Sequence, residues 1–378
     1  MKMKKITALL LALAMSLSLA ACGGDSASAG GSTPAPTEPA AQTSESADES
    51  GQTVILDRNG DVYAEAEDAD APTEYPVTLT DQAGREVTIE AKPETLVSGY
   101  YISTSLCIAL GLQDQLVGIE AKADTRPIYA RSAPGLLELP SVGTAKEFDL
   151  EGCAALAPDL VILPLKLQDA ADSLAELGIP ALVVNPEDQT LLEEAMTLVA
   201  AATDTRARAA QLADFTVKQQ NRLTELLADA ERPNVYLAGN SDFLSTAGGA
   251  MYQSSMIEMA GGRNVAQEIT DTYWATVSYE QILTWNPDYI VLASDADYTV
   301  EDVMTDPNLA GCKAVENGDV LQIPGDAEAW DSPVPGGILG AVWLSGVLHP
   351  EECPEADTMA VIDEFYQTFY GFTYSEIG

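Results

Sequence analysis

Residue types that usually carry acid–base catalysis are scarce in this sequence. The chain has one histidine, His349, in the segment VLHPEE at the end of an apolar run. Because a catalytic or metal-binding histidine normally acts with companion groups, we expect His349 to cap the end of that helix. The nucleotide-binding glycine motif, the P-loop, the nucleophile elbow and the zinc-protease motif are all absent from the sequence. These observations argue against catalysis that depends on histidine, and we expect the protein not to be an enzyme.

An extracellular α/β enzyme is the alternative from another functional class. Serine and aspartate residues do stand in several of the predicted loops. A serine nucleophile needs a base to activate it, however, and without a suitable histidine the sequence offers no obvious one.

The cysteines give little further chemistry. None of them forms a C-x-x-C pair. Cys107 and Cys153 stand in apolar helical segments, where cysteine is typically a small buried side chain. Cys312 and Cys353 lie late in the chain, and an exported setting would permit a disulfide between them. The sequence does not decide whether these two pair.

The charge balance excludes some partners. Lys and Arg together number 18 against 59 Asp and Glu, which gives a net charge of −41. Binding to nucleic acid, or to an anionic membrane surface through charge, requires clustered cations. We therefore expect no nucleic-acid partner, and we interpret the acidity as favouring solubility.

The amino terminus predicts export and a lipid anchor. Residues 1–21, MKMKKITALLLALAMSLSLAA, combine a basic start, an apolar core and small residues before Cys22, as a secretory signal peptide does. The site resembles the bacterial lipobox, in which Cys22 would be acylated and become the first mature residue. We expect the protein at the extracytoplasmic face of the bacterial cell membrane, held there by lipid.

The rest of the chain divides by composition and periodicity. Residues 22–74 form an acidic, low-complexity segment that predicts a flexible tether, with a loose hairpin in TVILDRNGDVY. Beyond it, strands alternate with helices, which favours mostly parallel sheets flanked by helices. Residues 187–231 contain no Pro or Gly, which predicts a long helix that is broken at most near Thr203 and Asp204. The predicted fold is therefore α/β, with two lobes at 75–202 and 233–378 joined by one long rigid helix at 203–232.

One unit occurs twice, once in each predicted lobe. LEGCAALAPDLVIL begins at residue 150 and YEQILTWNPDYIVL at residue 279. Each reads as a short helix, a Pro-Asp junction and an apolar strand, with a glutamate at the second position. These glutamates, Glu151 and Glu280, fall in the first helical turn, where the helix dipole favours acid.

Caps for both helices can be read from the sequence. Asp149 is a plausible N-cap of the first copy. Ser278 followed by Gln281 would make a capping box at the second.

From about residue 75 to its end, the chain resembles the class III substrate-binding proteins of ABC importers, which capture ferric siderophores, cobalamin and haem. The resemblance rests on PVTLTDQAGREVTIEAKPETLVS, the two repeated units, MIEMAGGRNVA and GAVWLSGVLHPE, in the expected order. It implies that Glu151 and Glu280 pair with arginines on the two permease subunits, since two separated anionic points fix orientation on a two-fold partner. A merely structural role at the two helix starts is the alternative. We expect a monomer that docks on a permease dimer, with little closure on ligand binding because a long helix joins the lobes.

The resemblance also implies that the ligand lies between the lobes. Loops expected to face that cleft carry aromatic beside polar side chains, which suits a large, flat or chelated ligand. The candidate ligand-binding residues are Tyr100, Tyr101, Lys146, Lys166, Asn240, Asp242, Phe243, Tyr252, Tyr273, Trp274, Trp330 and Asp331.

An iron chelate of siderophore type is the expected cargo, mainly because it is the commonest cargo of the resembled family. Lys146 and Lys166 could balance an anionic chelate, but no arginine cluster supports a highly charged catecholate. Aromatic walls would also suit cobalamin or haem. Haem would need an axial ligand to its iron, and Tyr101 would be a better candidate than His349. A ligand-sensing lipoprotein without a transport role would share the fold. Apart from its ligand, no cofactor and no metal site are expected.

Overall fold

The computed structural model describes residues 54–56, 62–65, 71–272 and 274–377. The signal peptide at 1–21, Cys22, most of the tether at 22–74 and the candidate ligand residue Tyr273 lie outside the described residues. Two short strands, β1 (Val54–Leu56) and β2 (Val62–Glu65), pair antiparallel and confirm the hairpin expected at the Asn-Gly turn.

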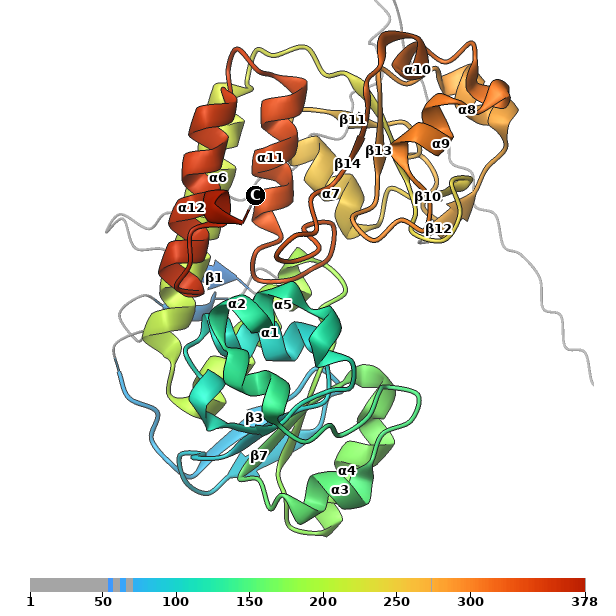
Figure 1. Cartoon of the computed structure of the whole chain (residues 1–378). Coiled ribbons are helices and arrows are strands. Elements are labelled where there is room, and N and C mark those ends of the chain that lie inside the picture. The colour runs from blue at the N-terminus through green and yellow to red at the C-terminus, as the bar shows by residue number, and fades with distance from the viewer. Residues whose placement is uncertain (1–53, 57–61, 66–70, 273, 378) are drawn as a thin grey trace, which may run out of the picture. The chain divides into compact units, whose positions relative to one another are not determined.

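The amino-terminal lobe contains a four-stranded, fully parallel sheet in the order β6-β5-β7-β8 (Figure 1). Strands β7 and β8 are buried along their whole length, and their sequences LVILP and ALVV are accordingly apolar without alternation. The elements of this lobe are β5 (Leu96–Ser98), α1 (Tyr101–Ala109), β6 (Leu116–Gly118), α2 (Pro127–Ser132), α3 (Leu150–Ala155), β7 (Leu160–Pro164), α4 (Gln168–Glu176) and β8 (Ala181–Val184).

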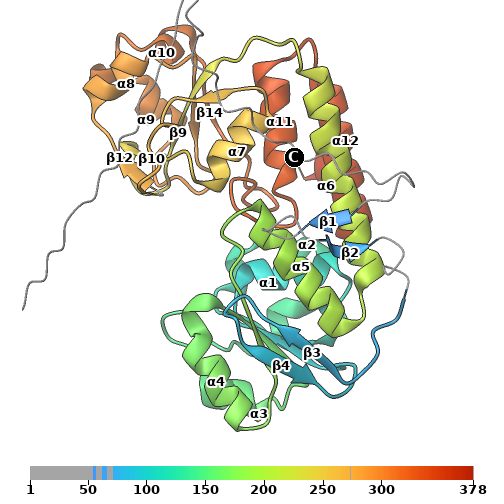
Figure 2. The same ribbon diagram turned by 180° about the vertical axis from the view of Figure 1, so that it is seen from behind.

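A separate hairpin, β3 (Val77–Thr80) and β4 (Glu86–Ile89), precedes that sheet and confirms the predicted alternating pair (Figure 2). Its turn is fixed by the buried Asp81, whose Oδ2 accepts the Arg85 guanidinium at 2.9 Å and the backbone N–H of Val183 at 3.0 Å. Because Val183 belongs to β8, this one carboxylate ties the hairpin to the lobe.

The carboxyl-terminal lobe contains a six-stranded mixed sheet. Its main order is β12-β10-β9-β13-β14, and β11 pairs with β9. The strands β11, β9, β13 and β14 run parallel to one another, whereas β10 is antiparallel to both of its neighbours, β9 and β12. The elements are β9 (Asn234–Ala238), β10 (Ser245–Ala247), α7 (Tyr252–Met259), β11 (Arg263–Asn264), β12 (Trp274–Thr276), α8 (Tyr279–Trp285), β13 (Tyr289–Leu292), α9 (Val300–Met304), α10 (Lys313–Asn317), β14 (Val320–Gln322), α11 (Ile338–Leu348) and α12 (Glu355–Phe369).

Two helices connect these parts. The helix α5 (Gln189–Thr203) ends at Asp204, which adopts a left-handed conformation with φ of 60°, and α6 (Arg206–Leu226) follows. The break therefore lies where the sequence predicted it. The two-lobe α/β fold is confirmed, and the described residues of both lobes belong to one compact unit.

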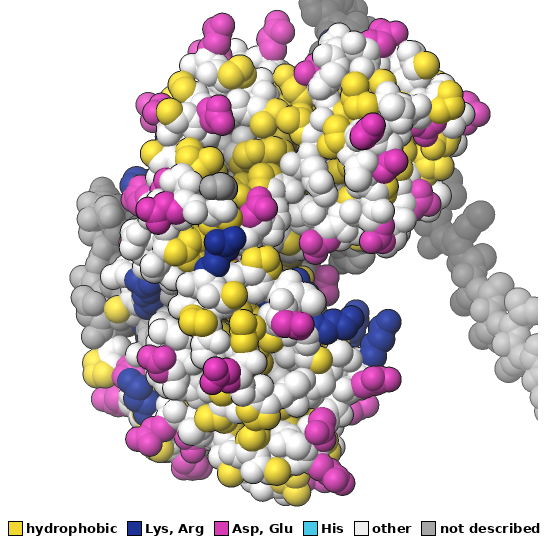
Figure 3. Space-filling model, in the orientation of Figure 1, with side chains coloured by type: hydrophobic (Ala, Val, Ile, Leu, Met, Phe, Trp, Pro, Cys, Tyr) yellow, Lys and Arg dark blue, Asp and Glu magenta, His cyan; other side chains and the backbone are white. Residues whose placement is uncertain are grey.

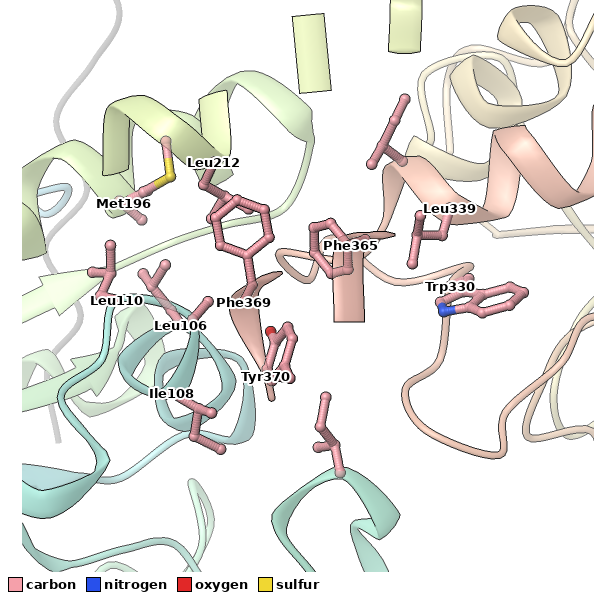
Figure 4. Close-up of a cluster of buried hydrophobic side chains, with 14 of the residues drawn as sticks. Leu106, Ile108, Leu110, Met196, Leu212, Trp330, Leu339, Phe365, Phe369 and Tyr370 are labelled. Atoms are coloured by element: carbon pink, nitrogen blue, oxygen red, sulfur yellow. The ribbon is translucent and has the colours of Figure 1, made fainter. Parts of the chain in front are cut away.

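The long helix is not the only connection between the lobes. One cluster of buried apolar side chains runs from α1 through α5 and α6 to α11 and α12 (Figure 4). Phe215 of α6 packs on Phe365 of α12 with ring centroids 5.2 Å apart. The Arg208 guanidinium donates to the carbonyl of Ala109 at 2.9 Å and to that of Thr368 at 2.6 Å, which joins the ends of α1 and α12. The two lobes are therefore joined by a packed core as well as by the long helix.

The repeated unit makes the same kind of hydrogen bond in both lobes, from the backbone of a neighbouring strand to its aspartate. Asp159 follows α3, and its Oδ2 accepts the backbone N–H groups of Glu94 and Thr95, both at 2.9 Å, just before β5. Asp288 follows α8, and its Oδ2 accepts the backbone N–H of Asn234 at 2.7 Å, at the start of β9. Since β7 pairs with β5 and β13 with β9, each aspartate fixes the register of its own strand on a parallel neighbour.

The helix caps largely follow the sequence prediction. Asp149 accepts the backbone N–H of Gly152 at 2.9 Å, so it is the N-cap of α3. Ser278 accepts the backbone N–H of Gln281 at 3.3 Å, which is one half of the expected capping box. His349 ends α11, is buried, and places Nε2 3.2 Å from the carbonyl oxygen of Gly261, which confirms a structural role.

Cys312 and Cys353 are both free and buried, so the disulfide that the sequence permitted does not form. Cys312 packs in the core of the carboxyl-terminal sheet, whereas Cys353 lies in the cluster shared with α11 and α12. Cys107 and Cys153 are also free and buried, as expected. Among the described helices, none is both long and apolar enough to cross a bilayer.

Candidate functional site

A cavity of about 750 Å³ lies between the two lobes. The loops that line it follow strands β5 and β8 in the first lobe and β9, β13 and β14 in the second. These loops leave the carboxyl ends of parallel strands, the position at which α/β sheets usually bind ligands. Figure 3 shows the hollow between the lobes.

Aromatic side chains form part of the cavity wall. Tyr100 and Tyr101 stand at the start of α1 with ring centroids 5.1 Å apart in an edge-to-face arrangement. Across the cavity, Trp274 of β12 keeps 38% of its surface exposed. An added Cβ on Gly239 would lie 3.0 Å from the Trp274 ring, so a glycine at the end of β9 lets the indole lie close to the sheet. Tyr252, at the start of α7, is almost entirely buried behind this wall.

The charged groups of the cavity are all acidic. Its lining includes the carboxylates of Glu187, Asp242, Asp295 and Asp331, and no Lys, Arg or His stands among the described residues that line it. Asp331 is buried, and its Oδ1 accepts the Ser294 hydroxyl at 2.6 Å. Burial raises the pKa of Asp331, although hydrogen bonds from Ser294 oppose the shift. Such a lining attracts cations and repels anions.

A smaller cavity of about 150 Å³ adjoins the first. Tyr101 and Asp295 line both cavities, so together they mark the boundary between them. A basic side chain, Arg126, lines the smaller cavity. Its guanidinium carbon lies 4.2 Å from the centroid of the Tyr101 ring. The Ser105 hydroxyl of α1 donates to Glu328 of the opposite lobe in the same cavity.

Two buried carboxyl groups lie near this arginine. Burial raises the pKa of Glu328 to about 7, against opposing hydrogen bonds from Ser105 and Tyr370 and the charge of Arg126. Burial also raises the pKa of Glu120, whose carboxyl group accepts the Tyr129 and Thr104 hydroxyls, each at 2.6 Å. Burial therefore shifts the pKa of both acids in the same direction, upward.

Several of the predicted ligand residues are brought together at the larger cavity. They come from both lobes and from loops more than 200 residues apart in the sequence. They are Tyr100, Tyr101, Asn240, Asp242, Tyr252, Trp274 and Asp331.

Others of that set do not line the cavity. Trp330 is a correction: it is 1% exposed, and its indole N–H donates to the Tyr366 hydroxyl at 2.8 Å within the shared core. Phe243 packs under its own loop against the Tyr236 ring, 5.5 Å away. Lys146 and Lys166 are exposed on loops of the amino-terminal lobe and do not line the cavity.

Charged residues at the two cavities were missed from the sequence, and Glu328 in the loop after β14 is one of them. Glu187 follows β8, Asp295 follows β13 and Arg126 lies in the loop after β6. Each stands beyond the carboxyl end of a parallel strand, so position along the strand pattern was a usable signal. Aromatic character alone was a poorer guide, since it selected the buried Trp330.

The two repeated glutamates are exposed. Glu151 lies in the first turn of α3 and Glu280 in the first turn of α8, at equivalent positions of the two lobes. A backbone hydrogen bond and the Ser278 hydroxyl lower the pKa of Glu280, so its side chain is anionic at neutral pH. Neither glutamate lines either cavity. Within the described residues, no cluster of three or more His, Cys, Asp or Glu side chains could hold a metal ion.

Comparisons with known proteins agree with this architecture. Residues 96–327 match the model of the periplasmic binding protein family. The chain is 27% identical over 323 residues to the molybdate-binding protein MolA of Haemophilus influenzae, which covers 78% of this chain and 91% of that protein. It is 29% identical over 219 residues to the vitamin B12-binding protein of Yersinia pestis, which covers 57% of this chain and 72% of that protein.

Solved structures show the same fold. A periplasmic solute binding protein from Veillonella parvula superposes with a TM-score of 0.70 at 26% identity, over 80% of this chain and 95% of that one. MolA with bound molybdate superposes with a TM-score of 0.69 at 25% identity, over 79% of this chain and 99% of that one.

Proposed function

Since this chain belongs to the periplasmic binding protein family of ABC importers, we propose that it captures an uncharged or cationic metal chelate for import. The cargo is an iron chelate of siderophore type, and the chain delivers it to the permease from the extracytoplasmic side of the membrane. The observation that carries this proposal is the acidic, aromatic cavity of about 750 Å³ between the lobes.

The size and chemistry of the cavity favour a bulky ligand. Its volume falls within the usual range of about 300–1,000 Å³ for small-molecule sites. The rings of Tyr100, Tyr101 and Trp274 offer apolar area to the organic shell of a chelate. The cavity carboxylates favour a cationic or neutral complex, such as a ferric hydroxamate, over a ferric catecholate with several negative charges.

The same charge argument separates this chain from a simple oxyanion carrier. MolA is named for molybdate, a small dianion. The charged side chains that a dianion would meet in the large cavity are all carboxylates, because no basic side chain is among its described lining residues. We therefore do not assign molybdate to the large cavity.

Cobalamin is the second candidate, and one observation favours it. The corrin is large and carries no net negative charge at its faces, and Trp274 presents an exposed indole for such a ring. The vitamin B12-binding relative of Yersinia pestis supports including this ligand in any screen.

A fluorescence and calorimetry screen tests the cargo. Cationic ferrioxamine B, neutral ferrichrome and cobalamin should bind with micromolar affinity or better and change the Trp274 emission. Ferric enterobactin and molybdate should bind at least 10-fold more weakly. Trp274→Phe should remove the emission change, whereas Trp343→Phe, on α11 away from the cavity, should keep it. Preferential binding of the catecholate would contradict the charge argument.

Delivery to the permease rests on the two repeated glutamates, and membrane attachment on a lipid at Cys22. The double variant Glu151→Lys/Glu280→Lys should keep the dissociation constant of the ligand but lose at least 10-fold in uptake, because two anionic contacts become repulsive. The control is Glu176→Lys/Glu355→Lys, which makes the same charge change at exposed positions of α4 and α12. Equal uptake by the two double variants would refute docking and favour a sensing role. Labelling with a radioactive fatty acid that is lost in Cys22→Ser tests the anchor.

A further inference from the structure

The smaller cavity and its arginine have no part in the function proposed above. Arg126 is half-buried at the boundary between the lobes, in the loop that precedes α2. Among the described residues, no ion pair involves its guanidinium. A guanidinium carries five N–H donors, so at this half-buried position it can pair with a ligand that supplies oxygen acceptors.

The orientation of this arginine is already fixed. Its guanidinium lies over the Tyr101 ring at 4.2 Å, a cation–π contact that holds the planar group against one wall. The rest of the cavity is lined from both lobes, by residues 125–129 on one side and by residues 325, 327–329 and 334 on the other. A guanidinium in contact with an aromatic ring keeps its N–H donors, which can pair with two oxygens at once.

The acids nearby limit what can enter. Asp295 lines the cavity and is anionic at its exposed rim. Glu328 lines it too, but burial raises the pKa of this carboxyl group to about 7, so at mildly acid pH it is neutral. The protonated Glu328 does not repel an anion. One negatively charged group of a ligand can then pair with Arg126.

The volume restricts the ligand further. A cavity of about 150 Å³ is roughly one fifth of its neighbour and is too small for a chelate. It exceeds the share of about 30 Å³ that one water takes in the liquid, so it has room for a small polar group. Because Tyr101 and Asp295 line both cavities, a ligand in the large cavity can reach the small one with a side arm.

We propose that the cavity beside Arg126 is an oxyanion subsite, which takes a carboxylate or a similar small oxyanion on the guanidinium. Two sources supply the same chemistry. The group is either a pendant arm of the chelate in the large cavity, in which case the inference rests on the proposed function, or a free small anion. The Tyr101 ring would then contact both ligands, since it lines both cavities.

A matched pair of probes tests the subsite. Ferrioxamine B ends in an amine and is cationic, whereas its N-succinyl derivative carries the same iron centre with a terminal carboxylate. Calorimetry at pH 6 measures both with the full chain and with Arg126→Ala, Arg126→Lys and Arg131→Ala. Arg131 is exposed on α2 and lines neither cavity, so it controls for charge alone.

Loss of the guanidinium should have opposite effects on the two probes. Arg126→Ala should weaken the succinyl derivative by about 10-fold or more, as expected for a charge-assisted hydrogen bond. It should strengthen ferrioxamine B, because a like charge is removed. Arg126→Lys should retain part of the succinyl affinity, and Arg131→Ala should change neither probe. An unchanged affinity of the succinyl derivative in a folded Arg126→Ala protein, judged by circular dichroism, would overturn the subsite.

Titration with free anions distinguishes the two sources of the oxyanion. It also tests the subsite if no chelate binds. Acetate and molybdate are titrated without chelate: binding that Arg126→Ala abolishes supports a free-anion ligand, and its absence beside Arg126-dependent succinyl binding supports the pendant arm. If neither chelate binds the full chain, the proposed cargo fails. The anion titration then decides the subsite alone, and a lack of Arg126-dependent binding rejects it.

Discussion

The carboxyl group of Glu328 should make the stability of this protein depend on pH in a way that one substitution removes. Glu328 belongs to the loop after β14 and is buried against α1, where its Oε1 accepts the Ser105 hydroxyl. The Ser105 hydroxyl also lies 2.9 Å from that of Tyr370. Within the described residues, the second oxygen, Oε2, has no hydrogen-bond partner. An ionised Glu328 would thus be poorly compensated.

The size of the effect follows from the two pKa values. Burial raises the pKa of Glu328 from the ordinary 4.5 to about 7 in the folded protein. Between these values the unfolded chain loses the proton while the folded chain keeps it, so folding becomes less favourable as the pH rises. At about 1.4 kcal/mol for each pKa unit, the difference corresponds to about 3 kcal/mol. The contribution is fully present below pH 4.5 and is lost by about pH 7.

The substitution Glu328→Gln removes the titration but keeps the shape and an acceptor for Ser105. Urea unfolding, followed by circular dichroism at intervals from pH 4.5 to pH 8.5, gives the free energy of unfolding of both proteins. The difference, variant minus parent, should rise by about 3 kcal/mol across this range. The exposed Glu176→Gln on α4 removes an equal charge and is the control. Parallel pH curves for Glu328→Gln and the parent would refute the reasoning.

Three further outcomes are expected. Asp159→Ala and Asp288→Ala should each lower the free energy of unfolding by about 1–2 kcal/mol in urea melts, since each strips backbone N–H groups of their acceptor; wild-type stability would contradict the register role. The buried thiols should resist a thiol reagent until the protein unfolds, and reductant should not change its Tm; burial raises the pKa of the Cys107 thiol to about 12. Small-angle scattering should give the same radius of gyration with and without ligand, because the lobes share a core; a large contraction would show a hinge.

The sequence predicted the fold well because its signals are local. The apolar runs LVILP and ALVV can be buried only inside a parallel sheet, and the Pro-Asp junctions mark where helix gives way to strand. The break at Asp204 was also visible, since a polar residue there can take a left-handed conformation. The packed core of the junction was only partly visible, because it joins residues such as Phe215 and Phe365 that lie far apart in the chain.

The sequence predicted where the candidate site lies, but it did not predict all of the side chains that line it. Tyr101 and Asp242 were found because loops after parallel strands carry ligand residues. Trp330 follows the same rule in sequence and yet is buried, since its indole N–H has a partner in the Tyr366 hydroxyl. Whether a loop side chain turns to the cavity or to the core depends on neighbours that only the folded chain supplies.

By itself, the sequence determined the alternation of elements, the doubled unit with Glu151 and Glu280, and the presence of a single histidine. These depend on residue types and short spacings, which the local backbone expresses directly. The tertiary structure alone decided the charge of the cavity and the presence of a separate guanidinium beside it. Electrostatic selectivity depends on which charges are brought within a few ångströms of each other, and for Arg126 and Asp295 that distance is set by the meeting of two lobes.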